Sequence, residues 1–170
     1  MAVKIKIMLD DGASMPTRAT DGSVGYDVRS TALYVVDGDG DKLKCYTEDD
    51  LYNLVECGHQ ANYIEVHTGV HVQPEDGYHV ELFPNSRIGK LKVIYGNSIG
   101  LIDPDYTGGI RVILNNTDDA WHVSEVIKFL PSNVVGQLVI RKKYDAEWEL
   151  TNKLDETVRG DGGFGSTEKK

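Results

Sequence analysis

Residues 97–110 read Asn97-Ser98-Ile99-Gly100-Leu101-Ile102-Asp103-Pro104-Asp105-Tyr106-Thr107-Gly108-Gly109-Ile110. The apolar residues of this stretch are flanked by turn-forming residues, which are Asn-Ser on one side and Asp-Pro-Asp-Tyr-Thr-Gly-Gly on the other. This pattern predicts a β-hairpin. If the chain turns at Pro104, the ring of Tyr106 can share a site with the carboxylate of Asp103. The stretch therefore predicts a tight β-structure whose turn places a carboxylate and an aromatic ring at one site.

The segments around this stretch predict further short strands. In residues 66–72 the alternation of Val66, Thr68, Val70 and Val72 indicates one buried face, and Pro74 to Gly77 then turns the chain. Alternating apolar residues follow at 78–82, and residues 110–114 and 137–140 are typical of two more strands. Many short strands separated by glycine and proline favour an all-β sandwich or jelly roll.

Composition limits the classes of function. A chain of 170 residues with 40% hydrophobic residues fits one domain with its own core. The net charge of -9 argues against duplex nucleic acid as a partner, because neutralising phosphates needs a basic surface. No apolar run reaches membrane-spanning length, and residues 1–7 alternate like a strand and not like a signal peptide. Cys45 and Cys57 form neither a disulfide framework nor a zinc motif, so we expect a reducing, cytoplasmic location.

The carboxyl-terminal residues combine glycines with an arginine, an aromatic ring and hydroxyls, reading Arg159-Gly160-Asp161-Gly162-Gly163-Phe164-Gly165-Ser166-Thr167. Glycine backbone N–H groups can approach an anion closely, and an arginine can bind a phosphate through two donors. Phe164 offers a flat face on which a base can stack. The segment has the composition of a lid over a nucleotide, although a glycine-rich terminus can also be a loose tail.

The sequence resembles the trimeric dUTPases (deoxyuridine 5'-triphosphate nucleotidohydrolases). The five motifs of that family occur here in order: Val24-Gly25-Tyr26-Asp27-Val28, Leu82 to Lys90, Asn97 to Gly108, Val135-Gly136-Gln137-Leu138-Val139, and Arg159 to Thr167. The resemblance implies a distorted jelly roll, a homotrimer with shared active sites, and a flexible, exchanged tail. It also implies Mg²⁺-dependent hydrolysis of dUTP to dUMP and pyrophosphate, in a bacterial or phage-infected cytoplasm.

The resemblance also implies roles for individual residues. Asp103 would be the general base that activates water, and Asp27 would steer Mg²⁺ through its water shell. The phosphate-binding residues would be Ser86, Arg87, Gln137, Arg159, Gly165, Ser166 and Thr167. The deoxyuridine-binding residues would be Asn97, Gly100, Ile102, Tyr106 and Phe164. Uracil would be selected because its O4 accepts where cytosine donates, and Tyr106 would leave no room for a 2′-hydroxyl.

Two features depart from the family pattern. The family usually has arginine directly before the serine of the second motif, whereas here Asn85 takes that place and Arg87 follows Ser86, so either residue can serve the role. Residues 37–62 form an insertion. Thr47 followed by three acids is a helix start and predicts a short helix at about 48–57. We therefore expect a β domain over 1–158 that includes this insertion, and a lid over 159–170.

Two alternatives remain open from the sequence. A dCTP deaminase, or a bifunctional deaminase and dUTPase, has the same fold, but it requires a glutamate in the strand after residue 109, and Ile110 to Leu114 contain none. The second alternative is a non-catalytic, nucleotide-responsive binding protein with the same fold. The insertion and Asn85 are the two departures from the family pattern that suggest it.

Overall fold

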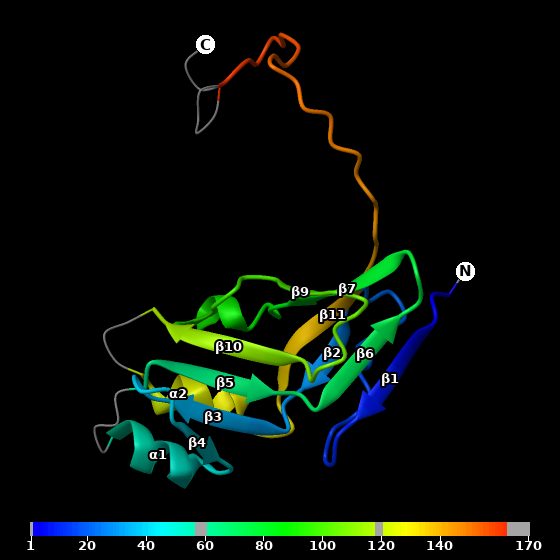
Figure 1. The fold of residues 1–170 in the computed structure, drawn as a ribbon. Helices are drawn as coiled ribbons and strands as arrows, with labels where there is room; N and C mark the ends of the chain where they lie inside the picture. The colour runs from blue at the N-terminus through cyan, green and yellow to red at the C-terminus, as the bar shows by residue number, and fades with distance from the viewer. Residues whose placement is uncertain (1, 57–60, 118–120, 163–170) are drawn as a thin grey trace.

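A computed structural model of the protein describes residues 2–56, 61–117 and 121–162. Its strands form two antiparallel sheets and a two-stranded ribbon (Figure 1). The five-stranded sheet has the order β4 (Lys42–Cys45), β3 (Ala32–Val36), β5 (Tyr63–His67), β10 (Arg111–Asn116) and β8 (Val93–Tyr95). The four-stranded sheet has the order β2 (Tyr26–Arg29), β11 (Val134–Lys142), β7 (Tyr78–Phe83) and β9 (Gly100–Ile102). The ribbon pairs β1 (Ile5–Leu9) with β6 (Val70–Pro74).

Short helices lie outside the sheets. They are α1 (Glu48–Glu56), the 3-10 helix η1 (Ile88–Lys90), α2 (Val123–Val126) and the 3-10 helix η2 (Ile127–Phe129). Within the described residues, no helix is long and apolar enough to span a membrane.

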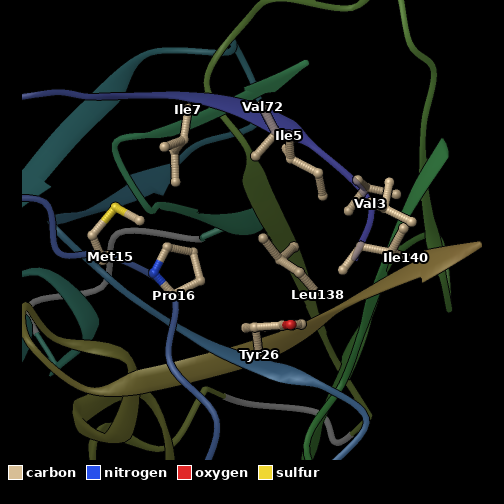
Figure 2. A pocket seen from close by; sticks show the side chains of 10 residues that line it. Val3, Ile5, Ile7, Met15, Pro16, Tyr26, Val72, Leu138 and Ile140 are labelled. Atoms are coloured by element: carbon tan, nitrogen blue, oxygen red, sulfur yellow. The ribbon is translucent and has the colours of Figure 1, made fainter. Parts of the chain in front are cut away.

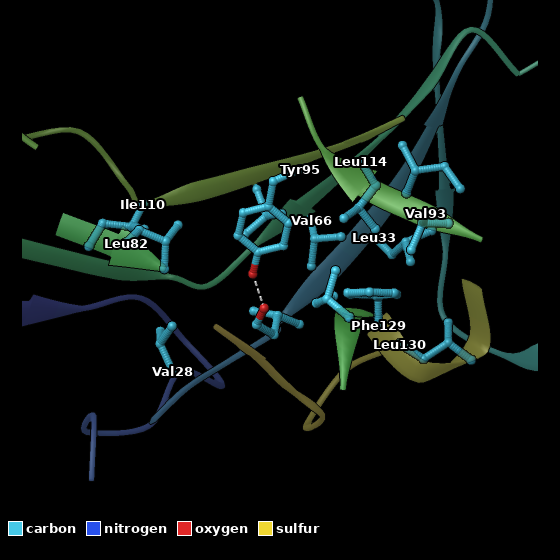
Figure 3. Packing of buried hydrophobic residues seen from close by; sticks show 14 of the residues in the cluster. Val28, Leu33, Val66, Leu82, Val93, Tyr95, Ile110, Leu114, Phe129 and Leu130 are labelled. Carbon is cyan, nitrogen blue, oxygen red and sulfur yellow. Dashed lines mark hydrogen bonds between the residues drawn. The ribbon is translucent and has the colours of Figure 1, made fainter. Parts of the chain in front are cut away.

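The core lies between the two sheets, where their apolar side chains meet (Figure 3). Phe129 on η2 is fully buried among side chains that include Leu33 and Val93. The Tyr95 hydroxyl donates a hydrogen bond to the Val135 carbonyl and so joins β8 to β11 across the core. Burial raises the pKa of Tyr95 far above its usual range, so this donor keeps its proton. The all-β sandwich expected from the alternating pattern is confirmed.

The single strand expected over residues 66–72 is two strands. Val66, Thr68, Val70 and Val72 are all buried, as the alternation predicted. The chain nevertheless leaves the five-stranded sheet after β5 and enters the ribbon at β6, because Gly69 adopts a φ of +63°. A Cβ at Gly69 would also lie 2.9 Å from the Cβ of Ala13. The positive φ and this close approach both require glycine at the position.

The expected hairpin over residues 97–110 is also wrong. β9 pairs with β7 in the four-stranded sheet, whereas β10 pairs with β5 and β8 in the other sheet. The segment therefore crosses from one sheet to the other. The turn residues 103–109 make this crossing, and the local turn pattern does not specify which sheet receives the strand that follows.

The insertion contributes to the core as well as to the surface. α1 begins with a reciprocal cap, because the Thr47 backbone N–H donates to the Asp50 carboxylate (2.9 Å) and the Asp50 N–H donates to the Thr47 hydroxyl (3.2 Å). Leu51 on α1 and Cys45 on β4 are fully buried and belong to the hydrophobic cluster. The Trp121 indole N–H donates to the Ala61 carbonyl (2.9 Å) and holds the returning end of the insertion near α2.

Candidate active site

A pocket of about 390 Å³ opens where the chain crosses between the sheets. It is lined by Leu82, Asn97, Gly100, Leu101, Ile102, Asp103, Tyr106, Gly109, Ile110, Arg111 and Ile113. The sequence predicted five of these as site residues, namely Asn97, Gly100, Ile102, Asp103 and Tyr106. The structure brings all five to one cavity, because β9 forms one wall and the start of β10 forms the other.

Asp103 follows directly after β9, at the mouth of this pocket. Its carbonyl accepts a hydrogen bond from the Tyr106 N–H (3.1 Å), which closes the turn expected at Pro104. Its side chain is exposed and has no hydrogen-bond partner among the described residues. A carboxylate in this position is accessible to water and can accept a proton from it.

Tyr106 folds back over the turn. Its hydroxyl donates to the Gly109 carbonyl (3.1 Å), and 41% of the residue is exposed. A Cβ at Gly108 would lie 2.5 Å from the Tyr106 hydroxyl, so glycine is required for the ring to take this position. The ring therefore forms a flat, partly exposed wall of the pocket beside Asp103.

The turn is also held from the ribbon. His71 on β6 donates from Nδ1 to the Thr107 carbonyl (2.9 Å), and its Nε2 lies 3.2 Å from the Asp10 carboxylate. The hydrogen bond to Thr107 raises the pKa of His71 above its usual value. Burial opposes this shift, and the hydrogen bond and the charge of Asp10 add to it. A protonated His71 can donate to both partners, so the ribbon fixes the turn most firmly when the imidazole is charged.

Asp27 and Gln137 form a second polar group away from the pocket. They are paired in the register of β2 and β11, and the Gln137 amide donates to the Asp27 carboxylate (2.8 Å). Both residues are half-buried. The pair leaves one carboxylate oxygen and one amide oxygen near the same sheet face, where a polyphosphate or its metal ion could be bound.

The second motif does not extend a guanidinium into solvent. Arg87 Nη2 donates to the carbonyls of Val134 (2.6 Å) and Lys128 (3.1 Å), which joins the η1 loop to the start of β11 and to η2. The Asn85 side chain donates to the same Val134 carbonyl (3.3 Å) and accepts from the Arg87 N–H (3.1 Å). Ser86 between them is exposed. In this arrangement Arg87 organises the loop, and the Ser86 hydroxyl is the group that faces outward.

The tail is described only as far as residue 162. Arg159 is exposed, and its Nε donates to the Gly162 carbonyl (2.8 Å). The chain after β11 runs away from the two sheets (Figure 1). The predicted residues Phe164, Gly165, Ser166 and Thr167 lie outside the described residues.

A second cavity, of about 240 Å³, lies between the ribbon and the four-stranded sheet (Figure 2). Its lining is almost entirely aliphatic, and includes Ile5, Ile7 and Leu138 around the ring of Tyr26. It offers no carboxylate or cation, so it is not a site for phosphate chemistry.

Sequence reasoning missed two kinds of residue at the site. Arg111 lines the pocket but reads in the sequence only as the exposed start of a strand. His71 fixes the turn from a strand that is distant in sequence. Neither residue belongs to the motif it supports, so only the pairing of β10 with β5 and the position of the ribbon reveal them.

Comparison with solved structures shows that the chain has the same fold as two phage dUTPases. A mutant dUTPase of Staphylococcus bacteriophage 80alpha with dUpNHpp superposes with a TM-score of 0.68 at 19% identity, over 96% of this chain and 98% of that chain. The dUTPase of S. aureus phage phi11, in a structure that describes the coordination of a structural Mg(II) ion, gives a TM-score of 0.64 at 17% identity over 90% and 99% of the two chains.

Sequence comparison gives the family. The family model described as dUTPase matches residues 50–168. The deoxyuridine 5'-triphosphate nucleotidohydrolase of Fusobacterium nucleatum is 29% identical over 98% of both chains, and that of Helicobacter pylori (strain ATCC 700392 / 26695) is 30% identical over 97% of both chains. The chain belongs to the dUTPase family.

Proposed function

We propose that this protein hydrolyses dUTP to dUMP and pyrophosphate in a Mg²⁺-dependent reaction, with water activated by Asp103. The observation that carries the proposal is one pocket that combines the exposed Asp103 carboxylate with four of the predicted nucleoside-binding residues, namely Asn97, Gly100, Ile102 and Tyr106. Family membership supports the same reaction.

The pocket has the features needed to select deoxyuridine. β9 is the edge strand of its sheet, and among the described strands it pairs only with β7, so one row of its backbone donors and acceptors can face a base. The Asn97 side chain adds one donor and one acceptor beside Gly100 and Ile102. A cytosine in this frame would leave polar groups unpaired, which is costly in a desolvated pocket. The Tyr106 ring would pack against the sugar and exclude a 2′-hydroxyl.

The residues present fit an outer-shell magnesium ion. No group of three or more metal-ligating side chains occurs in the described parts of the chain, so the protein offers no complete coordination cage there. Mg²⁺ retains several waters and favours phosphate oxygens, and a single half-exposed carboxylate such as Asp27 suits that behaviour. When bound, the ion would neutralise charge on the polyphosphate. Gln137 holds the Asp27 carboxylate in place, while Ser86 would donate to a phosphate oxygen.

The distances within one chain support an active site assembled from several subunits. Asp27 lies on β2 and Asp103 follows β9, at opposite edges of the four-stranded sheet. Three strand spacings put these edges about 14 Å apart, too far for both carboxylates to act on one triphosphate without a second chain. We therefore propose that the Asp103 of one subunit and the Asp27 of another meet in a homotrimer.

The extended arm after β11 supports this assembly. Large apolar residues on it are almost completely exposed, including Trp148 (92%), Leu150 (100%) and Val158 (100%). Exposed apolar side chains on an arm separated from the body are typical of a segment that packs on a partner. The arm would carry residues 159–170 to a neighbouring site, where Arg159 would bind a phosphate, Phe164 would stack on uracil, and Gly165 to Thr167 would close over the phosphates.

A nucleotide panel tests the proposed reaction. Purified protein with Mg²⁺ should release pyrophosphate from dUTP, and should release little from dCTP, dTTP or UTP. Release of ammonia from dCTP would instead show a deaminase. Tight binding of dUTP without turnover would favour the non-catalytic binding protein, and the reaction should stop when EDTA removes the metal.

A further inference from the structure

We propose that Arg111 is a positioning residue that fixes Tyr106 in the nucleoside pocket, and that buried Glu65 links Arg111 to Lys42 in the insertion. The inference rests on the proposed dUTPase function and extends it, because it assigns the inserted strand a role in sugar discrimination. The linked side chains run across the five-stranded sheet from β4 through β5 to β10, and then to the turn after β9.

The pocket end of this link is Arg111, the first residue of β10. It lines the pocket together with Tyr106. Its Nη1 donates to the Glu65 carboxylate at 3.0 Å, and the Tyr106 side chain lies close enough to its guanidinium to affect its pKa. Glu65, and then Tyr106, raise the pKa of Arg111 above its usual value. The guanidinium therefore lies between an anchored carboxylate and the pocket tyrosine.

The centre of the link is Glu65, whose side chain is only 4% exposed. One carboxylate oxygen accepts from Lys42 (2.7 Å), and the other accepts from Arg111 and from His67 (2.6 Å). In the register of β5 and β10, Arg111 lies opposite His67, so Glu65 is its diagonal neighbour on the same face. A buried carboxylate with three donors has little freedom to move, and it fixes the long side chain of Arg111.

The far end is Lys42 on β4, an edge strand contributed by the insertion. Its ammonium reaches across β3 to Glu65, although 42% of its side chain remains exposed. Removing this ammonium would leave Glu65 with two hydrogen-bond donors, so its side chain could move more. Arg111, which is held by Glu65, would then also be less well fixed. Tyr106 would then be less well fixed against the sugar.

The effect should appear in selectivity for the sugar. A loosely held Tyr106 admits a 2′-hydroxyl more easily, and losing one well-placed contact of this kind changes discrimination by about tenfold. The ratio of kcat/KM for dUTP to that for UTP should therefore fall about tenfold in Arg111→Met and by a smaller factor in Lys42→Met. Arg111→Lys should recover part of the ratio, because an ammonium can still reach Glu65 but cannot hold both partners.

The matched control is Lys44→Met. Lys44 lies on the same inserted strand and carries the same charge, but its ammonium lies over the rings of Tyr34 and Tyr46. Its ratio should equal that of the wild type, and melting temperatures identify any variant that is poorly folded. Glu65→Gln should lower the dUTP-to-UTP ratio as well, because it removes the carboxylate that holds Arg111. Glu65 is buried, so this variant can fail to fold. Lys42 and Arg111 are exposed, so their variants still test the inference in that case.

The outcomes separate the inference from the proposed function. Wild-type protein that does not hydrolyse dUTP would refute the proposed function. Wild-type turnover together with an unchanged dUTP-to-UTP ratio in folded Arg111→Met would refute the role of Arg111. An unchanged ratio in Lys42→Met alone, with a reduced ratio in Arg111→Met, would refute the link to the insertion.

Discussion

Replacing Asp103 by asparagine separates chemistry from stability at this site. The Asp103 side chain is exposed and makes no hydrogen bond to any described residue, so the substitution removes no intramolecular interaction. We expect the free energy of unfolding to change by less than about 0.5 kcal/mol, and the melting temperature by less than about 2 °C. An amide cannot accept the proton of water, so turnover should fall by about 10²–10⁴, which corresponds to about 2.7–5.4 kcal/mol in the activation barrier.

Single-turnover hydrolysis of dUTP, measured by rapid quench, gives the chemical step, and calorimetry with dUpNHpp gives binding. Binding should remain close to that of the wild type. Asp105→Asn is the matched control, because it removes the same charge from an exposed residue of the same turn and should leave turnover unchanged. If Asp103→Asn hydrolysed dUTP within about threefold of the wild-type rate, Asp103 would not be the base.

Four other perturbations test the assembly, the lid, the core and the pH response. Mixing Asp103→Asn chains with chains that end before Arg159 should restore part of the activity if sites are shared between subunits, and a fully active monomer in light scattering would contradict this. Phe164→Ala should lower kcat/KM about ten- to a hundredfold while Phe164→Trp retains much of it, because stacking requires an aromatic face; equal activity of the alanine variant and the wild type would exclude the lid. Phe129→Ala should reduce the free energy of unfolding in urea by about 3–5 kcal/mol, because the ring is fully buried, and a loss below about 1 kcal/mol would contradict the packing. Burial alone would raise the pKa of Glu65, but its hydrogen bonds to Lys42, His67 and Arg111 lower it from 4.5 to about 2, so the stability it contributes is present above about pH 4.5 and is lost as the pH falls toward 2. Urea midpoints of Glu65→Gln should accordingly depend less on pH across this window than those of the wild type.

The sequence alone determined the features that depend on near neighbours in the chain. Alternating apolar residues marked which side chains are buried, as at Val66 and Val70, because the side-chain period of a strand is local. The cap of α1 was predictable because Thr47 and Asp50 are three residues apart. The predicted pocket residues from Asn97 to Tyr106 lie within one short segment of the chain, and this segment also carries much of the resemblance to the dUTPases.

Only the tertiary structure decided which strands pair and where long side chains point. β9 and β10 are neighbours in sequence but lie in different sheets, because each pairs with strands that are distant in the chain. Arg87 turns inward because the carbonyls of Lys128 and Val134 lie within its reach. The positions of Asp27 and Asp103 at opposite sheet edges follow from strand order, which depends on burying apolar faces over long sequence separations. Local residue patterns determine turns, caps and the buried faces of strands, whereas the packing of the whole chain determines which elements pair and which side chains are in contact.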